Sequence, residues 1–344
     1  MRCRKNFAQL RIVLLGLALL VGLLGVLLAA AKVSAEAVKI RLGHGEAPND
    51  ITAIVFLNKQ VLKHAGTSYV VDPIHFRAPP ATFPALAAKE LDLTYMSFPG
   101  FASLVGKAKL DVKIVADIMG YADAEGSHSW VVREDSPIKK LEDLRGKTLG
   151  TNALGTGIDF AARNLLRKHG LEYPKDYQFI EVNFPNQEVM VREGKIDVGV
   201  LLIPLWHRAK AKGGLRRLFT SFDGTGRTQQ LSLIARTEFL TQHRQAMQDF
   251  IDDWLRSVRW YLDPKNRDEA IRITSRFTKI PEAAFKAWAF GPGDVYRDPD
   301  GFPDLLALQK NLDDLYSLGM TTFQVDVLKH VDLSFVRSAR MRLK

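Results

Sequence analysis

The chain has 344 residues, with 48 Lys and Arg against 38 Asp and Glu, so its formal net charge is +10. Five basic residues and no acidic ones lie in residues 1–35, which leaves 43 basic and 38 acidic residues, or +5, for the rest. No run of Lys and Arg with interleaved aromatic residues occurs, so the sequence predicts no nucleic-acid partner. Cys3 is the only cysteine, which excludes disulfides, thiol nucleophiles and cysteine metal sites after residue 35.

Residues 1–35 have the pattern of an export signal. Basic residues are followed by residues 12–31, a stretch of 20 without a charge. Small residues at 33–35 then offer a signal-peptidase site before Glu36. Because about 20 apolar residues also span a bilayer, the segment is either a cleaved signal peptide or an uncleaved anchor in the inner membrane. In both cases the sequence predicts that the remainder is exported to the periplasm.

The first third of the exported part alternates between predicted strands and helices. Residues 38–42 alternate in polarity and predict a first strand. A loop follows, and then a helix that Asn49 or Asp50 caps and that ends near His64. Further strands are predicted at residues 69–76, 91–96 and 112–119. This alternation is typical of a parallel sheet with crossover helices.

The second half continues in the same way. Strands are predicted at residues 129–133, 148–150, 179–182, 196–202 and 231–236. An amphipathic helix begins near Ile158 and is closed by Gly170, and a helix and turn cover residues 187–194. After residue 236 the pattern is helical to the end, with apolar stripes over residues 247–262 and 305–318 that predict helices facing a core.

Two stretches of the chain share one spacing. Pro80, Asp92, Pro99 and Phe101 recur as Pro185, Asp197, Pro204 and Trp206, with steps of 12, 7 and 2 residues in both stretches. Each first Pro is followed by a helix-like run, and each Asp lies in a turn that leads into a strand. A unit repeated in the two halves predicts two similar α/β lobes with a ligand held between them.

Residues 151–157 form a polar loop with two glycines between a predicted strand and a predicted helix. Backbone N–H groups at a helix start attract anions, and Thr151, Asn152 and Thr156 add side-chain donors. The three residues are therefore candidates for holding a carboxylate, sulfonate or phosphate group. The alternative is that Thr156 only caps its own helix, with Asp159 completing a capping box.

The ends of the strands in the first half supply further candidates. In open α/β sheets, ligands bind outside the carboxyl ends of the strands. Gly45 and Glu46 follow the first strand and Ser97 follows the third, so these residues are candidate ligand contacts. Phe98 and Trp206 are candidate walls for an apolar or aromatic ligand body, with ordinary core packing as the alternative.

Catalytic motifs are not evident. The eight histidines form no closely spaced metal-binding pair, and no Gly-x-Ser-x-Gly elbow occurs. The sequence therefore predicts no catalytic residue, no cofactor and no metal site.

Four motifs, in order along the chain, resemble the periplasmic substrate-binding proteins of ABC transporters for nitrate, sulfonates and taurine, a group that includes thiamine-pyrimidine-precursor binders. They are LEDLRGKTLG at 141–150, GKIDV at 194–198 with Pro204 downstream, ARTEFL at 235–240 and VDLSF at 331–335. The resemblance implies the fold class: α/β, a type II periplasmic-binding fold with two lobes joined by two crossing strands and a cleft that closes by a hinge motion.

The same resemblance implies how the lobes and contacts map onto the chain. The first lobe would be residues 36–120 with 230–344, and the second residues 121–229. Ligand contacts would come from Gly45, Glu46, Ser97, Phe98, Thr151, Asn152 and Thr156. Arg227, near the second crossing, is a candidate salt-bridge partner for an acidic group.

The expected function is to bind a ligand without catalysing a reaction on it. The protein would capture a small organic anion, a carboxylate or sulfonate with an aromatic or branched body, and deliver it to an ABC-transporter permease. The membrane would be contacted only through the N-terminal segment, if that segment stays uncleaved. Two alternatives remain open: a ligand-binding sensor domain, and a thiamine-pyrimidine-type enzyme on the same fold. The resemblance links that enzyme to a cysteine-rich iron site, which the cysteine-free exported part does not provide.

Overall fold

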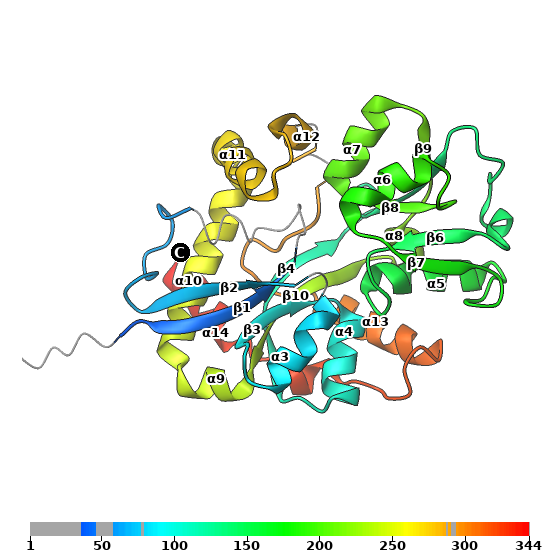
Figure 1. Cartoon of the computed structure of the whole chain (residues 1–344). Coiled ribbons are helices and arrows are strands. Elements are labelled where there is room, and N and C mark those ends of the chain that lie inside the picture. The colour runs from blue at the N-terminus through cyan, green and yellow to red at the C-terminus, as the bar shows by residue number, and fades with distance from the viewer. Residues whose placement is uncertain (1–35, 46–57, 77–78, 287, 290–293, 344) are drawn as a thin grey trace, which may run out of the picture. The chain divides into compact units, whose positions relative to one another are not determined.

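The computed structural model describes residues 36–45, 58–76, 79–286, 288–289 and 294–343 (Figure 1). The predicted export segment and Glu46 lie outside these ranges. All strands and helices named below belong to one compact unit, Val38–Lys344. Among the described residues, none of the helices combines the length and the apolar composition that a membrane span requires.

The strands are β1 (Val38–His44), β2 (Tyr69–His75), β3 (Leu93–Met96), β4 (Val112–Tyr121), β5 (Ser129–Arg133), β6 (Thr148–Thr151), β7 (Gln178–Glu181), β8 (Gly199–Leu201), β9 (Leu215–Thr220) and β10 (Thr228–Arg236). The helices are α3 (Phe83–Ala87), α4 (Phe98–Ala102), α5 (Gly157–Lys168), α6 (Phe184–Arg192), α7 (Ile203–Lys212), α8 (Ser221–Thr225), α9 (Thr237–Gln242), α10 (Arg244–Leu262), α11 (Arg267–Thr278), α12 (Glu282–Lys286), α13 (Leu305–Ser317) and α14 (Ser334–Arg342). Every predicted strand is confirmed, and no end moves by more than three residues.

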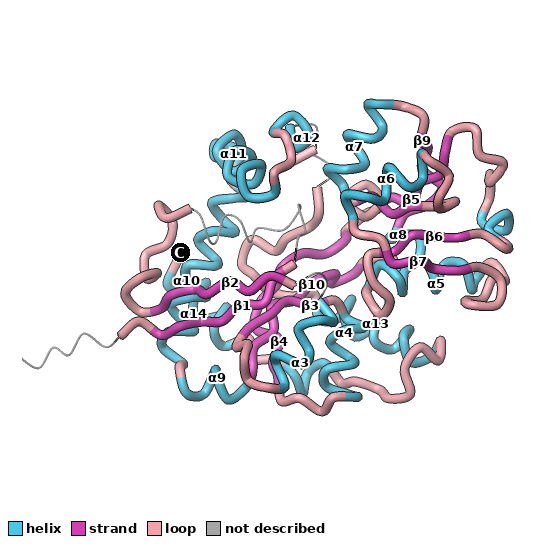
Figure 2. The backbone as a smooth tube through the Cα atoms, viewed as in Figure 1, coloured by secondary structure: helices cyan, strands magenta, loops and turns pink. Residues whose placement is uncertain are grey.

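The strands form two sheets of the same order (Figure 2). The first runs β2-β1-β3-β10-β4. In the second, the pair β7-β6 joins β8-β5-β9 through a parallel bridge between Leu149 and Val198. Four strands of each sheet run in the same direction, as predicted for a parallel sheet, but β10 and β5 run antiparallel to their neighbours. These two strands are the ones that the chain enters directly after crossing from the other sheet, which explains their reversed direction.

The two aspartates of the sequence repeat, Asp92 and Asp197, make equivalent hydrogen bonds in the two sheets. The Asp92 carboxylate accepts the backbone N–H of Arg41 on β1 at 2.9 Å, and the Asp92 N–H donates back to the Arg41 carbonyl. Asp197 exchanges the equivalent pair of bonds with Thr148 on β6, also with a carboxylate distance of 2.9 Å. The spacing found in the sequence is therefore a structural repeat of a sheet unit.

Helices cover both faces of the first sheet (Figure 1). On one face, Ile40 and Leu42 of β1 pack in a core with Phe250 and Trp254 of α10 and with α14. On the other face, α3, α4 and α13 close a second core. The apolar stripe predicted over residues 247–262 is confirmed as the buried side of α10. The second sheet has a core of its own, which α5, α6 and α7 complete.

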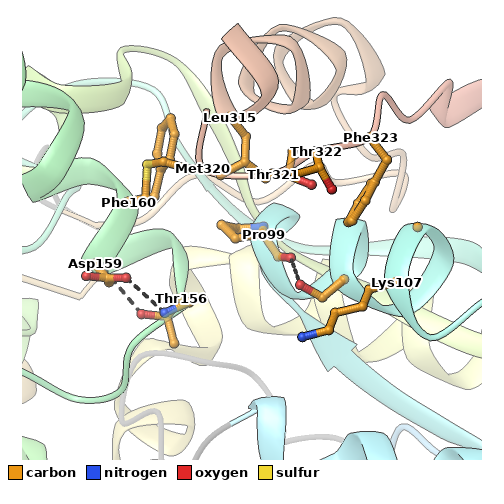
Figure 3. A pocket seen from close by; sticks show the side chains of 13 residues that line it. Pro99, Lys107, Thr156, Asp159, Phe160, Leu315, Met320, Thr321, Thr322 and Phe323 are labelled. Carbon is orange, nitrogen blue, oxygen red and sulfur yellow. Dashed lines mark hydrogen bonds between the residues drawn. The ribbon is translucent and has the colours of Figure 1, made fainter. Parts of the chain in front are cut away.

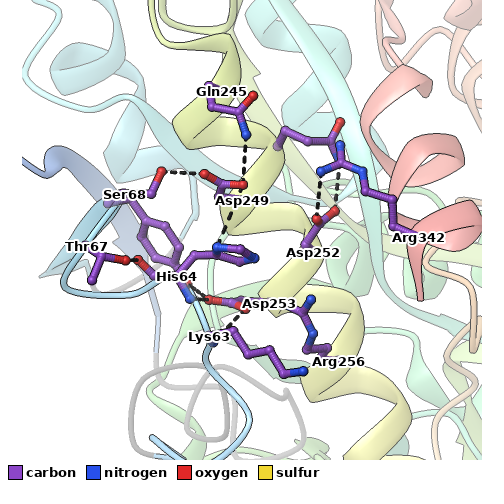
Figure 4. A network of polar contacts seen from close by, with 12 residues as sticks. Lys63, His64, Thr67, Ser68, Gln245, Asp249, Asp252, Asp253, Arg256 and Arg342 are labelled. Carbon is purple, nitrogen blue, oxygen red and sulfur yellow. Dashed lines mark hydrogen bonds and ion pairs between the residues drawn. The ribbon is translucent and has the colours of Figure 1, made fainter. Parts of the chain in front are cut away.

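The segment before β2 departs from the prediction. Residues 58–64 form turns instead of the end of a helix, while the start of that predicted helix lies outside the described residues. The backbone N–H groups of Lys63 and His64 donate to the Asp253 carboxylate of α10, both at 2.9 Å (Figure 4). Asp253 thus replaces the hydrogen bonds that a helix would have supplied. Because Asp253 is distant in sequence, no local pattern predicts this contact.

Next to this anchor, His64, Asp249 and Asp252 bring potential metal-ligand atoms within 4.8 Å of one another. The carboxylates are already engaged, because Asp249 accepts from Ser68 at 2.5 Å and Asp252 pairs with Arg342 at 3.0 Å. Figure 4 shows these contacts converging on α10. We assign the cluster a structural role, which is to hold the chain before β2 against that helix.

The strand β4, which leads to the first crossing, carries a buried acid. The Asp117 carboxylate is 4% exposed and accepts from the Gln229 side chain at 2.6 Å and from the Asp298 N–H at 2.9 Å. Burial raises the pKa of Asp117 to about 7, against the opposing effect of these bonds and of Arg297. The ordinary value in an unfolded chain is about 3.9, so the folded protein binds this proton more tightly.

This raised pKa predicts a pH effect on stability. Between about pH 4 and pH 7, the wild type should lose up to about 1.4 kcal/mol of unfolding free energy per pH unit relative to Asp117→Asn, because only the wild type must ionise a buried carboxyl. Urea unfolding of both proteins across that range measures the difference. Comparing the two proteins cancels the opposite contribution of His128, whose pKa burial lowers to about 3. A difference that does not change with pH would contradict the assignment.

Candidate functional site

The predicted ligand contacts lie along one end of the strands in each of the two sheets. We call this row of strand ends the edge of that sheet. In the first sheet, this edge holds the carboxyl ends of β1 and β3 and, because β10 is antiparallel, the amino end of β10. In the second sheet it holds the carboxyl ends of β6, β7 and β8 and the amino end of β5. The chain leaves and enters both sheets here, from Tyr121 to Ser129 and from Thr220 to Thr228.

The start of α5 contacts the edge of the first sheet. The Gly157 N–H donates to the Ser97 hydroxyl at 3.1 Å, and the rings of Phe98 and Phe160 meet edge to face with centroids 4.9 Å apart. A Cβ at Gly157 would lie 2.9 Å from the side-chain oxygen of Gln230. The glycine therefore permits a close approach of α5 to the first sheet.

Several backbone N–H groups in the loop before α5 already have hydrogen-bond partners within the protein. The N–H groups of Leu154 and Gly155 donate to the carboxylates of Glu181 and Asp159 at 2.9 and 2.8 Å. The Thr156 hydroxyl accepts from the Asp159 N–H at 3.3 Å, so the alternative that Thr156 caps its helix is confirmed. Asp159 bonds Gly155 instead of completing a capping box. Fewer N–H groups remain for an anion than the sequence indicated.

Asp159 adds a negative charge beside this loop. Its carboxylate is buried and pairs with Arg163 at 2.7 Å. Burial raises the pKa of Asp159, while the Arg163 charge and the Gly155 N–H lower it. The Thr156 hydroxyl also donates to the Ala153 carbonyl at 3.0 Å and lies 3.4 Å from the Asn152 side-chain oxygen.

Three buried polar atoms at the two edges have no hydrogen-bond partner in the part of the chain that the structure describes. They are the Thr151 hydroxyl, the Ser129 hydroxyl and the Gln230 side-chain oxygen, in residues that are 0%, 1% and 4% exposed. Buried polar groups usually have partners, and a few atoms elsewhere in the described residues, such as both amide atoms of Asn311, lack one too; the presence of three such atoms at the two edges is what suggests a polar ligand there. Thr151 was predicted. Ser129 and Gln230 were missed, because a single polar residue near the start of a strand forms no motif.

The remaining predicted residues are engaged within the protein. The Gly45 N–H donates to the Tyr95 hydroxyl at 2.7 Å, and that hydroxyl donates to the Gly45 carbonyl at 3.1 Å. Phe98 and Trp206 are 1% and 6% exposed and pack in cores. Their role as ligand walls stays a prediction. Arg227 pairs with Asp304 at 2.6 Å.

A cavity of about 560 Å³ flanks the contact between α4 and α5 (Figure 3). Thr156, Asp159 and Phe160 line one side and Pro99 and Lys107 another, while residues 320–323 cover it. Its volume lies within the usual range for small-molecule pockets.

Equal sheet orders, two crossings and facing edges define the two-lobed periplasmic-binding fold, which confirms the predicted fold class. A family model described as NMT1/THI5 like matches residues 81–267, more than half of the chain, and the chain belongs to this family. No protein of curated function matches the sequence.

Solved structures share the fold. The alkanesulfonate-binding protein SsuA from Xanthomonas axonopodis pv. citri, bound to MOPS, is 18% identical with a TM-score of 0.69, over 87% of this chain and 100% of that chain. The nitrate-binding protein NrtA from Synechocystis PCC 6803 is 15% identical with a TM-score of 0.71, over 90% of each chain. The desulfurization enzyme DSZB is 16% identical with a TM-score of 0.63, over 89% of this chain and 100% of that chain. At these identities the likeness concerns the fold.

Proposed function

We propose that the protein is the substrate-binding component of an ABC importer, which captures a small organic anion between its lobes in the periplasm and delivers it to a membrane permease. The observation that carries this proposal is the set of unpartnered polar atoms on Thr151, Ser129 and Gln230. Leaving such atoms buried without partners is costly, and a bound ligand removes the cost. Family membership supports the proposal, as does the likeness to SsuA and NrtA, which bind an alkanesulfonate and nitrate.

The proposed contacts are those expected from the sequence, with two additions. They are Gly45, Glu46, Ser97, Phe98, Thr151, Asn152, Thr156 and Trp206, joined by Ser129 and Gln230. A contact between Arg227 and an acidic ligand would exchange the ion pair with Asp304 for another. The lobes are proposed as residues 36–120 with 230–344 and residues 121–229, and ligand would favour the closed form through contacts that the open form lacks.

A thermal-shift screen of residues 36–344 against alkyl sulfonates, nitrate and aliphatic and aromatic carboxylates tests the proposal. A ligand at about 100 times its dissociation constant adds about 2.7 kcal/mol of stability. For the best ligand, Thr151→Ala should weaken binding about 10-fold, because one hydrogen bond of about 1.4 kcal/mol is lost. Thr241→Ala removes the same atoms from an exposed position on α9 and should leave affinity unchanged. Absence of a shift with every compound would reject the proposal.

An enzyme on the same fold is the second candidate function, favoured by the likeness to DSZB. The two candidates differ in the fate of the ligand. Mass spectrometry after overnight incubation with the bound compound recovers it unchanged from a binding protein and converted from an enzyme.

A further inference from the structure

We propose that the cavity of about 560 Å³ beside α4 and α5 is a second binding site, which takes an amphipathic acid with a medium-length alkyl chain, such as a free fatty acid. Of the contacts proposed for the transported ligand, only Thr156 lines this cavity, so the second site is distinct from the strand ends. The site itself does not depend on the proposed function, whereas its effect on ligand capture rests on that function.

Apolar side chains form much of the cavity wall. They belong to Pro99, Phe160, Leu315, Met320 and Phe323 (Figure 3). The ring of Phe323 packs directly on the backbone that follows α4, because a Cβ at Gly106 would lie 2.0 Å from it. Residues 320–323 are thereby held over the cavity. An alkyl chain inside would leave water on several sides, which is favourable in proportion to the apolar area removed.

One end of the cavity suits an acid group. Lys107 lines this end, is exposed to solvent and, within the part of the chain that the structure describes, forms no ion pair or hydrogen bond through its side chain. The Thr321 hydroxyl is buried and has no partner among those residues either. Unlike Asn311, whose amide is also unpartnered, Thr321 lines the cavity. A carboxylate can pair with the ammonium and accept from the hydroxyl.

Asp159, an acid among the lining residues, does not oppose such a ligand. Its carboxylate pairs with Arg163 at 2.7 Å and accepts the Gly155 N–H at 2.8 Å, so its charge is balanced within the protein. In Figure 3, Asp159 lies toward the opposite end of the cavity from Lys107. The acid group would therefore lie near Lys107, and the alkyl chain would extend toward Phe160.

The cavity also connects the two sheets. Its lining includes α4, which follows β3 of the first sheet, and α5, which follows β6 of the second. An occupant contacts both helices and favours the arrangement in which they are close. Because coupling between two binding sites is reciprocal, a fatty acid should strengthen binding of the transported ligand by about 5-fold, the lower end of the usual range.

Titration calorimetry with butanoate, hexanoate, octanoate and decanoate tests the site. Affinity should rise about 10-fold for every two methylene groups that become buried and should level off once the cavity is full. Lys107→Met keeps an apolar stem but removes the charge, so it should weaken octanoate binding about 5-fold and leave octan-1-ol binding unchanged. Lys109→Met, at an exposed position outside the lining, should bind octanoate as the wild type does.

Further variants locate the bound acid. Thr151→Ala, which alters the strand ends, should leave octanoate affinity unchanged, and Phe323→Ala should weaken octanoate binding more than butanoate binding. The melting temperature of ligand-free Lys107→Met should equal that of the wild type, because no bond of the Lys107 side chain is lost. A lower octanoate affinity of this variant then reports recognition and not unfolding.

Two results would overturn the inference and leave the proposed function intact. One is that none of the four acids binds. The other is that Thr151→Ala weakens octanoate binding while Lys107→Met does not, which would place the acid at the strand ends. An anion screen without a hit at the strand ends rejects the proposed function instead, and octanoate binding that depends on Lys107 would still support the second site.

Discussion

Replacing Gly157 by valine is expected to weaken ligand binding by about 10- to 100-fold while each lobe stays folded, because overpacking a close contact costs about 1 to 3 kcal/mol. Gly157 begins α5, and a Cβ there would already lie 2.9 Å from Gln230 and 3.3 Å from Ser97. Its φ lies outside the left-handed region, so the backbone itself accepts a side chain. The added methyl groups would separate α5 from the first sheet, and calorimetry with the best ligand of the screen measures the loss.

A graded series controls this experiment. Gly157→Ala should have a smaller effect than valine, since the nearest atoms belong to the flexible end of Gln230. Near-UV circular dichroism and the melting temperature of the ligand-free protein should change little in both variants. A valine variant that binds with wild-type affinity would show that ligand capture does not require α5 to approach the first sheet.

Replacing Asp92 by alanine should lower the free energy of unfolding by about 3 kcal/mol, a value at the low end for a broken buried ion pair. The Asp92 carboxylate is 2% exposed and pairs with Arg41 at 2.6 Å and with Arg236 at 2.8 Å. The value is low because the Arg41 side chain is 34% exposed and regains water. Urea unfolding followed by circular dichroism gives the loss.

Its counterpart in the sequence repeat provides the matched variant. Asp197 makes the same backbone exchange with Thr148 and, within the described residues, has no ion pair in addition. Asp197→Ala should therefore cost only about 1 kcal/mol, the worth of an ordinary hydrogen bond. Equal losses of unfolding free energy at the two positions would mean that the ion pairs of Asp92 with arginines do not stabilise the protein.

The sequence predicted the frame of the fold because the frame depends on local patterns. Alternation of polarity placed β1, and the shared spacing around Asp92 and Asp197 predicted two similar lobes, each of which contains a sheet of the same order. The direction of β10 was not predicted. It depends on which sheet the chain re-enters, and neither periodicity nor spacing encodes that choice.

The candidate site was predicted less completely, because its polar balance is decided by partners from distant segments. The loop before α5 was recognised as a possible anion cradle, but Glu181 and Ser97, which occupy its N–H groups, come from 27 and 60 residues away. Gln229 and Gln230 look alike in the sequence. Only the fold separates them, by giving partners to one amide and none to the oxygen of the other.

The central claim, that ligand is held between two lobes that close on it, is tested most directly by the distance between the lobes. Residues 36–344 contain no cysteine, so Lys39→Cys and Lys195→Cys, at positions whose lysine side chains are 64% and 65% exposed, admit one dye on each lobe. Energy transfer should rise on addition of the organic acid that most stabilises the protein, and the rise should be smaller in Gly157→Val. Unchanged transfer at a saturating concentration of that acid would contradict the account.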